Sequence, residues 1–147
     1  MTGSGTGSQQ PSSAAFGTLT VNDVMEREVR TAYPWTKADA VATQMLEGFG
    51  CVPIVDDAHR LVGLITEHDL LAVLERGRPW EAQTADEIMI HHPYSVRPET
   101  DVNTLVHVLR KSDLIRVPVV DGQGRLVGIV ARRDLLRAYL GATRKKA

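Results

Sequence analysis

The stretch VPIVDDAHRLVGLITEHDLL, residues 52–71, decides the fold, because the chain repeats it 65 residues later as VPVVDGQGRLVGIVARRDLL, residues 117–136. Eleven of the 20 aligned positions are identical. Upstream, a shift of 64 residues aligns TVNDVM at 20–25 with TADEIM at 84–89. An internal repeat of this kind indicates two copies of one structural unit of about 60 residues.

Each copy predicts the order strand, helix, strand, strand, helix. Apolar residues recur at helical spacing after Thr36 and again after Thr100, so these two threonines are the expected N-caps of the first helices. Two β-branched runs separated by a polar turn predict a hairpin in each copy. In the first copy we expect a short strand near 29–32, the hairpin strands at 51–55 and 60–65, and a second helix at 67–75. In the second copy we expect the short strand at Val96 and the second helix at 132–140.

The composition is that of an ordinary globular chain. Apolar residues make up 43% of its 147 positions, and 17 Lys and Arg oppose 18 Asp and Glu, so no overall field draws the chain to nucleic acid or an anionic membrane. The apolar runs are far shorter than the about 18 residues of a membrane-spanning helix. A lone cysteine excludes an internal disulfide, and no secretory signal pattern opens the sequence, so we expect a cytoplasmic protein.

The chain divides into four parts by composition and repeat. Residues 1–17 contain mostly small and polar side chains and predict a disordered tail. The units occupy 18–78 and 79–142, and a basic tail at 143–147 follows. One unit of this size buries only about 60% of its unfolded surface, so we expect the two to pack together and leave two related clefts between them.

The paired units resemble cystathionine β-synthase (CBS) domains, and the pair resembles a Bateman module. The resemblance rests on the VPIVD and VPVVD strands, the LVGLI and LVGIV strands and the DLL helix starts. It implies an α/β (α+β) fold in which two tandem β-α-β-β-α units pack with pseudo-twofold symmetry. In this family the clefts commonly hold AMP, ADP or ATP, sometimes S-adenosylmethionine, and in some members no known ligand.

GLITEHD, residues 63–69, resembles the ribose- and phosphate-binding signature of the family. A strand ends here at a helix N-terminus, whose free N–H groups suit a phosphate, and Thr66 adds a hydroxyl donor. The Asp69 carboxylate matches the paired donors of a ribose diol. The same spacing forms a capping box in which Asp69 reaches back to Thr66, so both interpretations stay open.

The second copy keeps the aspartate as Asp134 but has Ala131 in place of the threonine. A reciprocal cap therefore cannot be the whole reason for Asp134, although its charge also suits the helix dipole. This difference favours ligand binding at Asp69 over capping alone. A phosphate in the second cleft would instead contact Arg132 or Arg133.

Carried over by position, the family arrangement adds residues of the opposite unit to each cleft. The Asp69 cleft, with Thr66 and His68, would gain His92, Pro93, Tyr94, Leu114, Ile115 and Arg116. The Asp134 cleft, with Ala131, Arg132 and Arg133, would gain Glu28, Val29, Arg30, Phe49, Gly50 and Cys51. Apolar members would sandwich the adenine or simply pack the core, and Arg116 or Arg30 would lie near a phosphate.

Other chemistry is not indicated. His91 and His92, considered with His68, do not predict a metal site, because adjacent strand residues point to opposite faces and no carboxylate completes the set. Cys51 precedes an apolar strand, which is typical of a core residue rather than a nucleophile. No catalytic triad order or carboxylate pair is present, and the two units leave no room for a catalytic domain.

We therefore expect a non-catalytic regulatory module that requires no cofactor, binds an adenine nucleotide and signals to a protein partner by a shift between conformations. An interaction module with empty clefts and an S-adenosylmethionine sensor are the alternatives. The second helices are apolar on more than one face, which predicts a homodimer.

Overall fold

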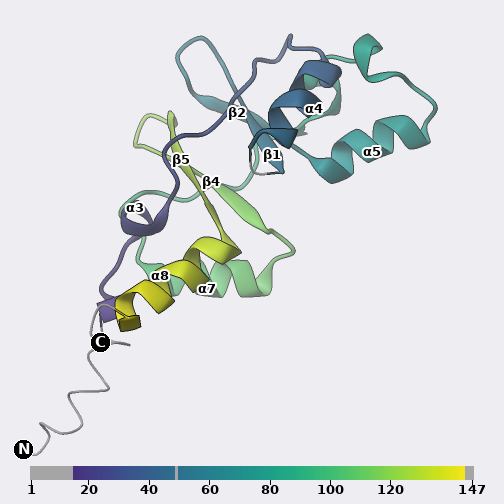
Figure 1. Ribbon diagram of the computed structural model, residues 1–147. Coiled ribbons are helices and arrows are strands. Elements are labelled where there is room, and N and C mark those ends of the chain that lie inside the picture. The colour runs from purple at the N-terminus through teal and green to yellow at the C-terminus, as the bar shows by residue number, and fades with distance from the viewer. Residues whose placement is uncertain (1–14, 49, 145–147) are drawn as a thin grey trace, which may run out of the picture.

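The computed structural model describes residues 15–48 and 50–144, in which two related units follow one another (Figure 1). Of the tail predicted to be disordered at 1–17, residues 15–17 are helical instead, because Phe16 packs against the core of the second unit. Of the predicted basic tail, residues 143 and 144 belong to the last helix. Residues 1–14, Phe49 and residues 145–147 lie outside the described residues. The first unit contains α4 (Ala38–Leu46), β1 (Cys51–Val55), β2 (Leu61–Thr66) and α5 (Glu67–Glu75). The second contains α7 (Val102–Lys111), β4 (Arg116–Val120), β5 (Leu126–Ala131) and α8 (Arg132–Arg144). Shorter elements are α3 (Val21–Val24), η1 (Trp80–Ala82), α6 (Ala85–Ile88) and β3 (Ile90–His91).

The two hairpins have the same antiparallel register. Pairing of β1 with β2 runs from Cys51↔Thr66, and pairing of β4 with β5 runs from Arg116↔Ala131. Both ladders contain one irregularity, before the last pair, where the β-branched strands reach the polar turn. The predicted mixed fold with two repeated units is thus confirmed.

The first strand and the helix caps differ from the prediction. The short strands are reduced to single parallel bridges, Ala32↔Ile54 and Val96↔Val119, because a proline two residues later in each copy lacks the N–H that would continue a ladder. The cap of α4 is Lys37, since the Thr36 hydroxyl instead accepts a hydrogen bond from the Tyr33 N–H. The cap of α7 is Asp101 rather than Thr100, and its carboxylate accepts from the N–H of Thr104 at 3.0 Å.

The units exchange their leading segments. Val21 and Met25 of the α3 segment lie in the core of the second unit, whereas Ala85 and Met89 of the α6 segment lie in the core of the first. Glycine in the repeated LVG motif makes this packing possible. A Cβ at Gly63 would lie 2.7 Å from Cγ of Met89, and one at Gly128 would lie 2.8 Å from Sδ of Met25. Each core therefore includes residues from across the predicted boundary between 78 and 79.

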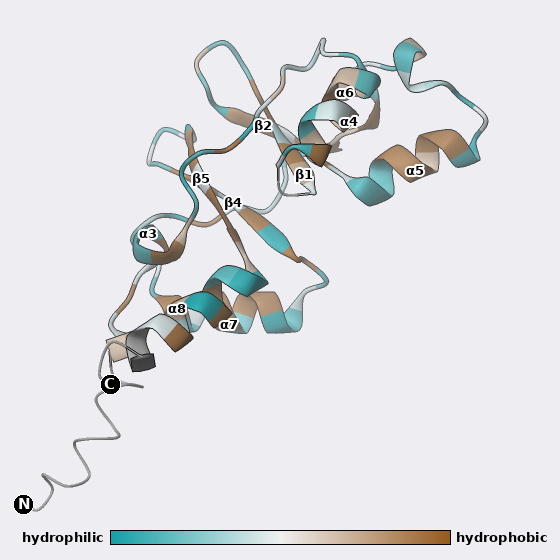
Figure 2. Cartoon of the chain, viewed as in Figure 1, coloured by the Kyte–Doolittle hydropathy of each residue, from teal (hydrophilic) through white to brown (hydrophobic). Residues whose placement is uncertain are grey.

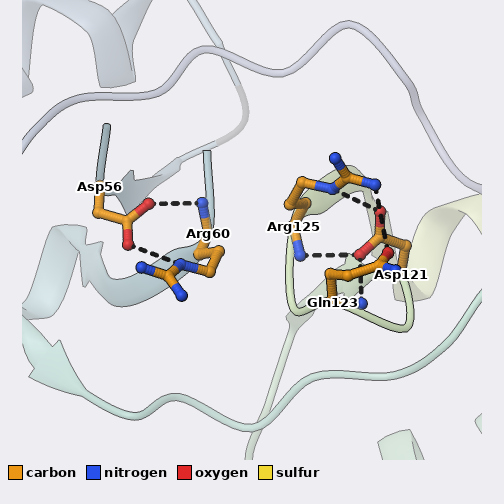
Figure 3. Close-up of polar contacts among 5 residues, drawn as sticks. All are labelled: Asp56, Arg60, Asp121, Gln123 and Arg125. Atoms are coloured by element: carbon orange, nitrogen blue, oxygen red, sulfur yellow. Dashed lines mark hydrogen bonds and ion pairs between the residues drawn. The ribbon is translucent and has the colours of Figure 1, made fainter. Parts of the chain in front are cut away.

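The hairpin tips join the two units. The N–H of Leu61 donates to the carbonyl of Gly124, and the N–H of Leu126 donates to the carbonyl of His59, both at 3.0 Å. In each turn an aspartate accepts a hydrogen bond from the arginine four residues later (Figure 3). Arg60 Nε donates to Asp56 Oδ2 at 2.9 Å, and Arg125 Nε donates to Asp121 Oδ2 at 3.0 Å. The tips are thus fixed by main-chain bonds across the pseudo-twofold axis.

Apolar side chains fill the space between the hairpins. Cys51 and Leu64 of the first unit pack with Ile129 of the second, and the hairpin strands are largely hydrophobic in Figure 2. No helix within residues 15–48 and 50–144 has both the length and the apolar character needed to cross a membrane.

Candidate functional site

A cavity of about 270 Å³ lies where β1 and β4 begin and β2 ends. We call it the shared cavity, because both units line it. Its lining consists of Gly50, Cys51, Leu64, Thr66, Glu67, His68, Ile90, Asp113, Leu114, Ile115 and Arg116. Apolar side chains form its walls, and charged side chains enter from the start of α5 and from the segment between α7 and β4. This combination is typical of a small-molecule site.

Thr66 and Asp69 form the capping box at the start of α5. Asp69 Oδ2 accepts from the Thr66 N–H at 2.8 Å and from the Thr66 hydroxyl at 2.9 Å, while the Asp69 N–H donates to Thr66 Oγ1 at 3.4 Å. The capping interpretation of this spacing is therefore correct. Asp69 Oδ1 has no hydrogen bond to any residue that the structure describes, which leaves one carboxylate oxygen for a ligand.

The second unit keeps half of this box. Asp134 Oδ2 accepts from the Ala131 N–H at 2.7 Å, and Asp134 Oδ1 lies 3.3 Å from Nη1 of Arg137. An aspartate at this position therefore caps the helix even without the threonine hydroxyl. Both of its carboxylate oxygens are engaged within the chain, in contrast to those of Asp69.

Arg116 is the only basic side chain among the described residues that line the shared cavity, apart from the histidine. Its Nε is buried and has no hydrogen-bond partner among the described residues. Its guanidinium lies against Gly50, whose φ is +78° and where an added Cβ would stand 3.2 Å from Nη1. The absence of a side chain at Gly50 thus leaves room for the guanidinium. Because buried N–H groups normally donate a hydrogen bond, we expect Nε of Arg116 to donate to an acceptor on a ligand.

Cys51 forms part of the wall. The residue is 5% exposed, and burial raises the pKa of its thiol to about 11, with Arg116 opposing the rise and Glu67 adding to it. A thiol with this pKa is almost fully protonated near neutral pH, so its reactivity is low. Cys51 is therefore a small core residue, as the sequence indicates.

The other residues predicted for the Asp69 cleft are partly brought together. Leu114, Ile115 and Arg116 line the shared cavity with Thr66 and His68, whereas Asp69, His92, Pro93 and Tyr94 do not. The chain turns away after β3 through His92, which has a φ of +52°, and Ile90 takes the place beside the cavity. Sequence reasoning missed Leu64, Glu67, Ile90 and Asp113, although the position of Glu67 directly after Thr66 gave a signal for it.

The residues predicted for the Asp134 cleft separate into three places. Glu28, Val29 and Arg30 line an open depression of about 400 Å³ with Glu47 and Gly48. Gly50 and Cys51 lie in the shared cavity instead, because the β1 and β4 starts approach each other there. Ala131, Arg132, Arg133 and Asp134 line neither space.

Two of the three arginines predicted for the second cleft, Arg30 and Arg132, are engaged with protein groups. Arg30 pairs with Glu47 at 3.1 Å. Arg132 donates to three main-chain carbonyls, those of Leu114 at 3.0 Å, Leu109 at 3.3 Å and Ser112 at 3.4 Å. The side chain of Arg132 thus caps main-chain carbonyls at and just after the C-terminal end of α7. Among the described residues no group of three His, Cys, Asp or Glu side chains is arranged to hold a metal ion.

A model of the CBS domain family matches residues 21–76 and 85–141. The chain therefore belongs to the CBS-domain family and carries two copies of the domain. The uncharacterized protein MK0525 of Methanopyrus kandleri is 35% identical over 129 residues, which cover 85% of this chain and 66% of that protein.

Two solved structures are similar in fold and sequence. CBSX2 in complex with AMP has a TM-score of 0.75 and 28% identity, and the match covers 84% of this chain and 97% of that one. CBSX2, from Arabidopsis thaliana, is described as a CBS-pair protein. The CBS domain pair of protein MJ0100, in complex with 5′-methylthioadenosine and S-adenosyl-L-methionine, has a TM-score of 0.74 and 28% identity, with coverages of 83% and 97%. A CBS pair thus makes up nearly all of each of these two chains.

Proposed function

We propose that this protein is a regulatory module, not an enzyme, that binds an adenine nucleotide in the shared cavity and passes its occupancy to a protein partner. The observation that carries the proposal is at Arg116, which lines the cavity and whose buried Nε lacks an acceptor within the described residues. Phosphate oxygens are among the acceptors that form strong, charge-assisted hydrogen bonds with arginine. The AMP complex of CBSX2 supports the choice of ligand.

The remaining parts of the cavity suit the rest of a nucleotide. Leu64, Ile90, Leu114 and Ile115 offer apolar surface for an adenine ring. Asp69 does not itself line the cavity, but it follows His68, which does, and its Oδ1 is available for a ribose hydroxyl. Because Leu114 and Ile115 come from one unit and Leu64 from the other, a bound ring would contact both units. Binding would then fix their relative position, which is how occupancy would reach a partner.

S-Adenosylmethionine is the second candidate ligand, since the MJ0100 pair is in complex with it and with 5′-methylthioadenosine. An interaction module with an empty cavity is the third possibility. In both ligand-binding cases the same adenosine contacts apply, and only the group next to Arg116 differs.

We further propose a homodimer formed by α5 and α8. Both helices expose large apolar side chains, among them Leu71 at 62% and Leu136 at 67% exposure, and α5 is hydrophobic along much of its length in Figure 2. A second copy of the chain would cover these residues. Light scattering at micromolar concentration tests this, and a particle of 16.1 kDa would refute it.

Thermal unfolding of the full chain with AMP, ADP, ATP, S-adenosylmethionine and GTP tests the ligand. A ligand at about 100 times its Kd adds about 2.7 kcal/mol, or roughly 5 to 10 °C for a chain of this size. We expect this shift with adenine nucleotides, a smaller one with GTP, and its loss in Arg116→Gln but not in the exposed control Arg78→Gln. A larger shift with S-adenosylmethionine than with any nucleotide would identify a sensor of that compound. If none of these compounds shifts the unfolding temperature, the interaction module with an empty cavity is the remaining function.

A further inference from the structure

The charges around the shared cavity are unbalanced. Two carboxylates, Glu67 and Asp113, line it together with one guanidinium, that of Arg116. Both acidic residues are exposed, whereas Arg116 is half-buried and its Nε is shielded from solvent, so the negative charges lie closer to solvent than the positive charge. The first phosphate of a ligand therefore meets the favourable charge of Arg116, whereas any further phosphate meets the unfavourable charges of Glu67 and Asp113.

The start of α5 adds no attraction for further phosphates. Its first turn contains Glu67 and Asp69, and the Asp69 carboxylate already accepts from the Thr66 N–H and hydroxyl. These negative charges offset the positive end of the helix dipole. The repeat does not impose Glu67, because α8 has Arg132 at the equivalent position, although it keeps the aspartate as Asp134.

We propose that Glu67 and Asp113 make the shared cavity selective for adenosine ligands that carry at most one phosphate, such as AMP or 5′-methylthioadenosine, over ADP and ATP. This inference rests on the proposed nucleotide function and specifies its ligand. The cavity volume of about 270 Å³ lies at the small end of the range of about 300 to 1,000 Å³ that is usual for small-molecule sites, which favours a nucleoside with a short substituent.

The expected selectivity follows from the additional charge of a polyphosphate. ATP carries about two more negative charges than AMP, and each would lie near the two carboxylates in a partly solvated environment. Repulsion at this range corresponds to roughly a tenfold weaker binding of ATP than of AMP at low salt. The preference should shrink at high salt, because the two exposed carboxylates are accessible to screening ions.

Titration calorimetry on the full chain tests the inference with 5′-methylthioadenosine, AMP, ADP and ATP, at low and high salt. EDTA is present throughout, so that no divalent cation bridges phosphates and carboxylates. We expect the affinity to fall from AMP through ADP to ATP. In the double variant Glu67→Gln, Asp113→Asn, the ratio of AMP to ATP affinity should fall to about threefold or less. The matched control is Glu75→Gln, at the opposite end of α5, which should keep the parent ratio.

The outcomes separate this inference from the proposed function. If no adenosine ligand binds, both are wrong. If ATP binds as tightly as AMP or more tightly, or if the double variant keeps the parent ratio, the nucleotide function stands and the charge selectivity is refuted.

Discussion

Replacing Asp69 with alanine tests whether its carboxylate holds a ribose in addition to capping α5. The change removes the bonds at 2.8 and 2.9 Å from Oδ2 to Thr66, so apo stability should fall by about 1 kcal/mol whichever role Asp69 has. If Oδ1 also accepts from a ribose hydroxyl, the variant loses a charge-assisted hydrogen bond worth about 1.5 to 3 kcal/mol on binding. Nucleotide affinity should then fall about 10- to 100-fold.

Asp134→Ala is the matched control, because it removes the equivalent bond of 2.7 Å to the Ala131 N–H outside the shared cavity. Apo stability should fall by a similar amount, about 1 kcal/mol, while nucleotide affinity should stay within about twofold of the parent. Urea unfolding measures the first quantity and titration calorimetry with AMP the second. An Asp69→Ala protein that binds AMP like the parent would falsify the ribose role and leave Asp69 as a cap alone.

Three further predictions concern the thiol, the hairpin turn and the exchanged segments. The rate of alkylation of Cys51 should rise with pH towards about 11, and a half-maximal rate near pH 8 would contradict this. Because Arg116 lowers the pKa of the thiol, Arg116→Ala should slow the alkylation at any pH below that value. Main-chain and side-chain bonds from Arg60 hold the pKa of Asp56 below its ordinary value of 3.8, so its stabilising effect is present above that pH and lost as the pH falls through the lowered value. Urea unfolding should therefore show Asp56→Asn to be less stable than the parent at pH 7 and equal to it in strong acid, and a constant difference would disprove the linkage. Gly128→Ala should cost about 1 to 3 kcal/mol in urea unfolding, because its Cβ would lie 2.8 Å from a carbonyl of the exchanged segment, whereas Gly141→Ala, with open space around it, should cost nothing; equal effects would show that the close approach is relieved.

The hairpins and second helices were predictable from the sequence because local signals agree there. β-Branched runs, a polar turn and an apolar helix repeat in both copies, and the structure places them in one register. The extent of the first strands was not predictable in this way, since the run 29–32 has the composition of a strand but only Ala32 forms a bridge to the hairpin. Segment exchange was also missed: TVNDVM and TADEIM are visible as repeats, but nothing local states which core receives them.

The candidate site was predicted in part for a related reason. The repeat implied two equivalent clefts, and the chemistry at Thr66 could be read from one strand end. That Gly50 and Cys51 would join Arg116 in a single cavity depends on the approach of two strand starts around the pseudo-twofold axis, which is a property of packing between the units. Glu67 was overlooked because a charged first-turn residue is usually explained by the helix dipole alone.

The exchange of Met25 and Met89 also has a consequence for how the protein comes into existence. As the chain leaves the ribosome, the first unit has all its hairpin and helices but still lacks the α6 segment that completes its core, and the α3 segment has no second unit to enter. Neither half is self-sufficient, so the two units must gain stability in one cooperative step. A gene that encoded only one unit would yield a chain with an incomplete core and a leading segment that has no core to enter. The two units can therefore be inherited or moved between genes only as a pair.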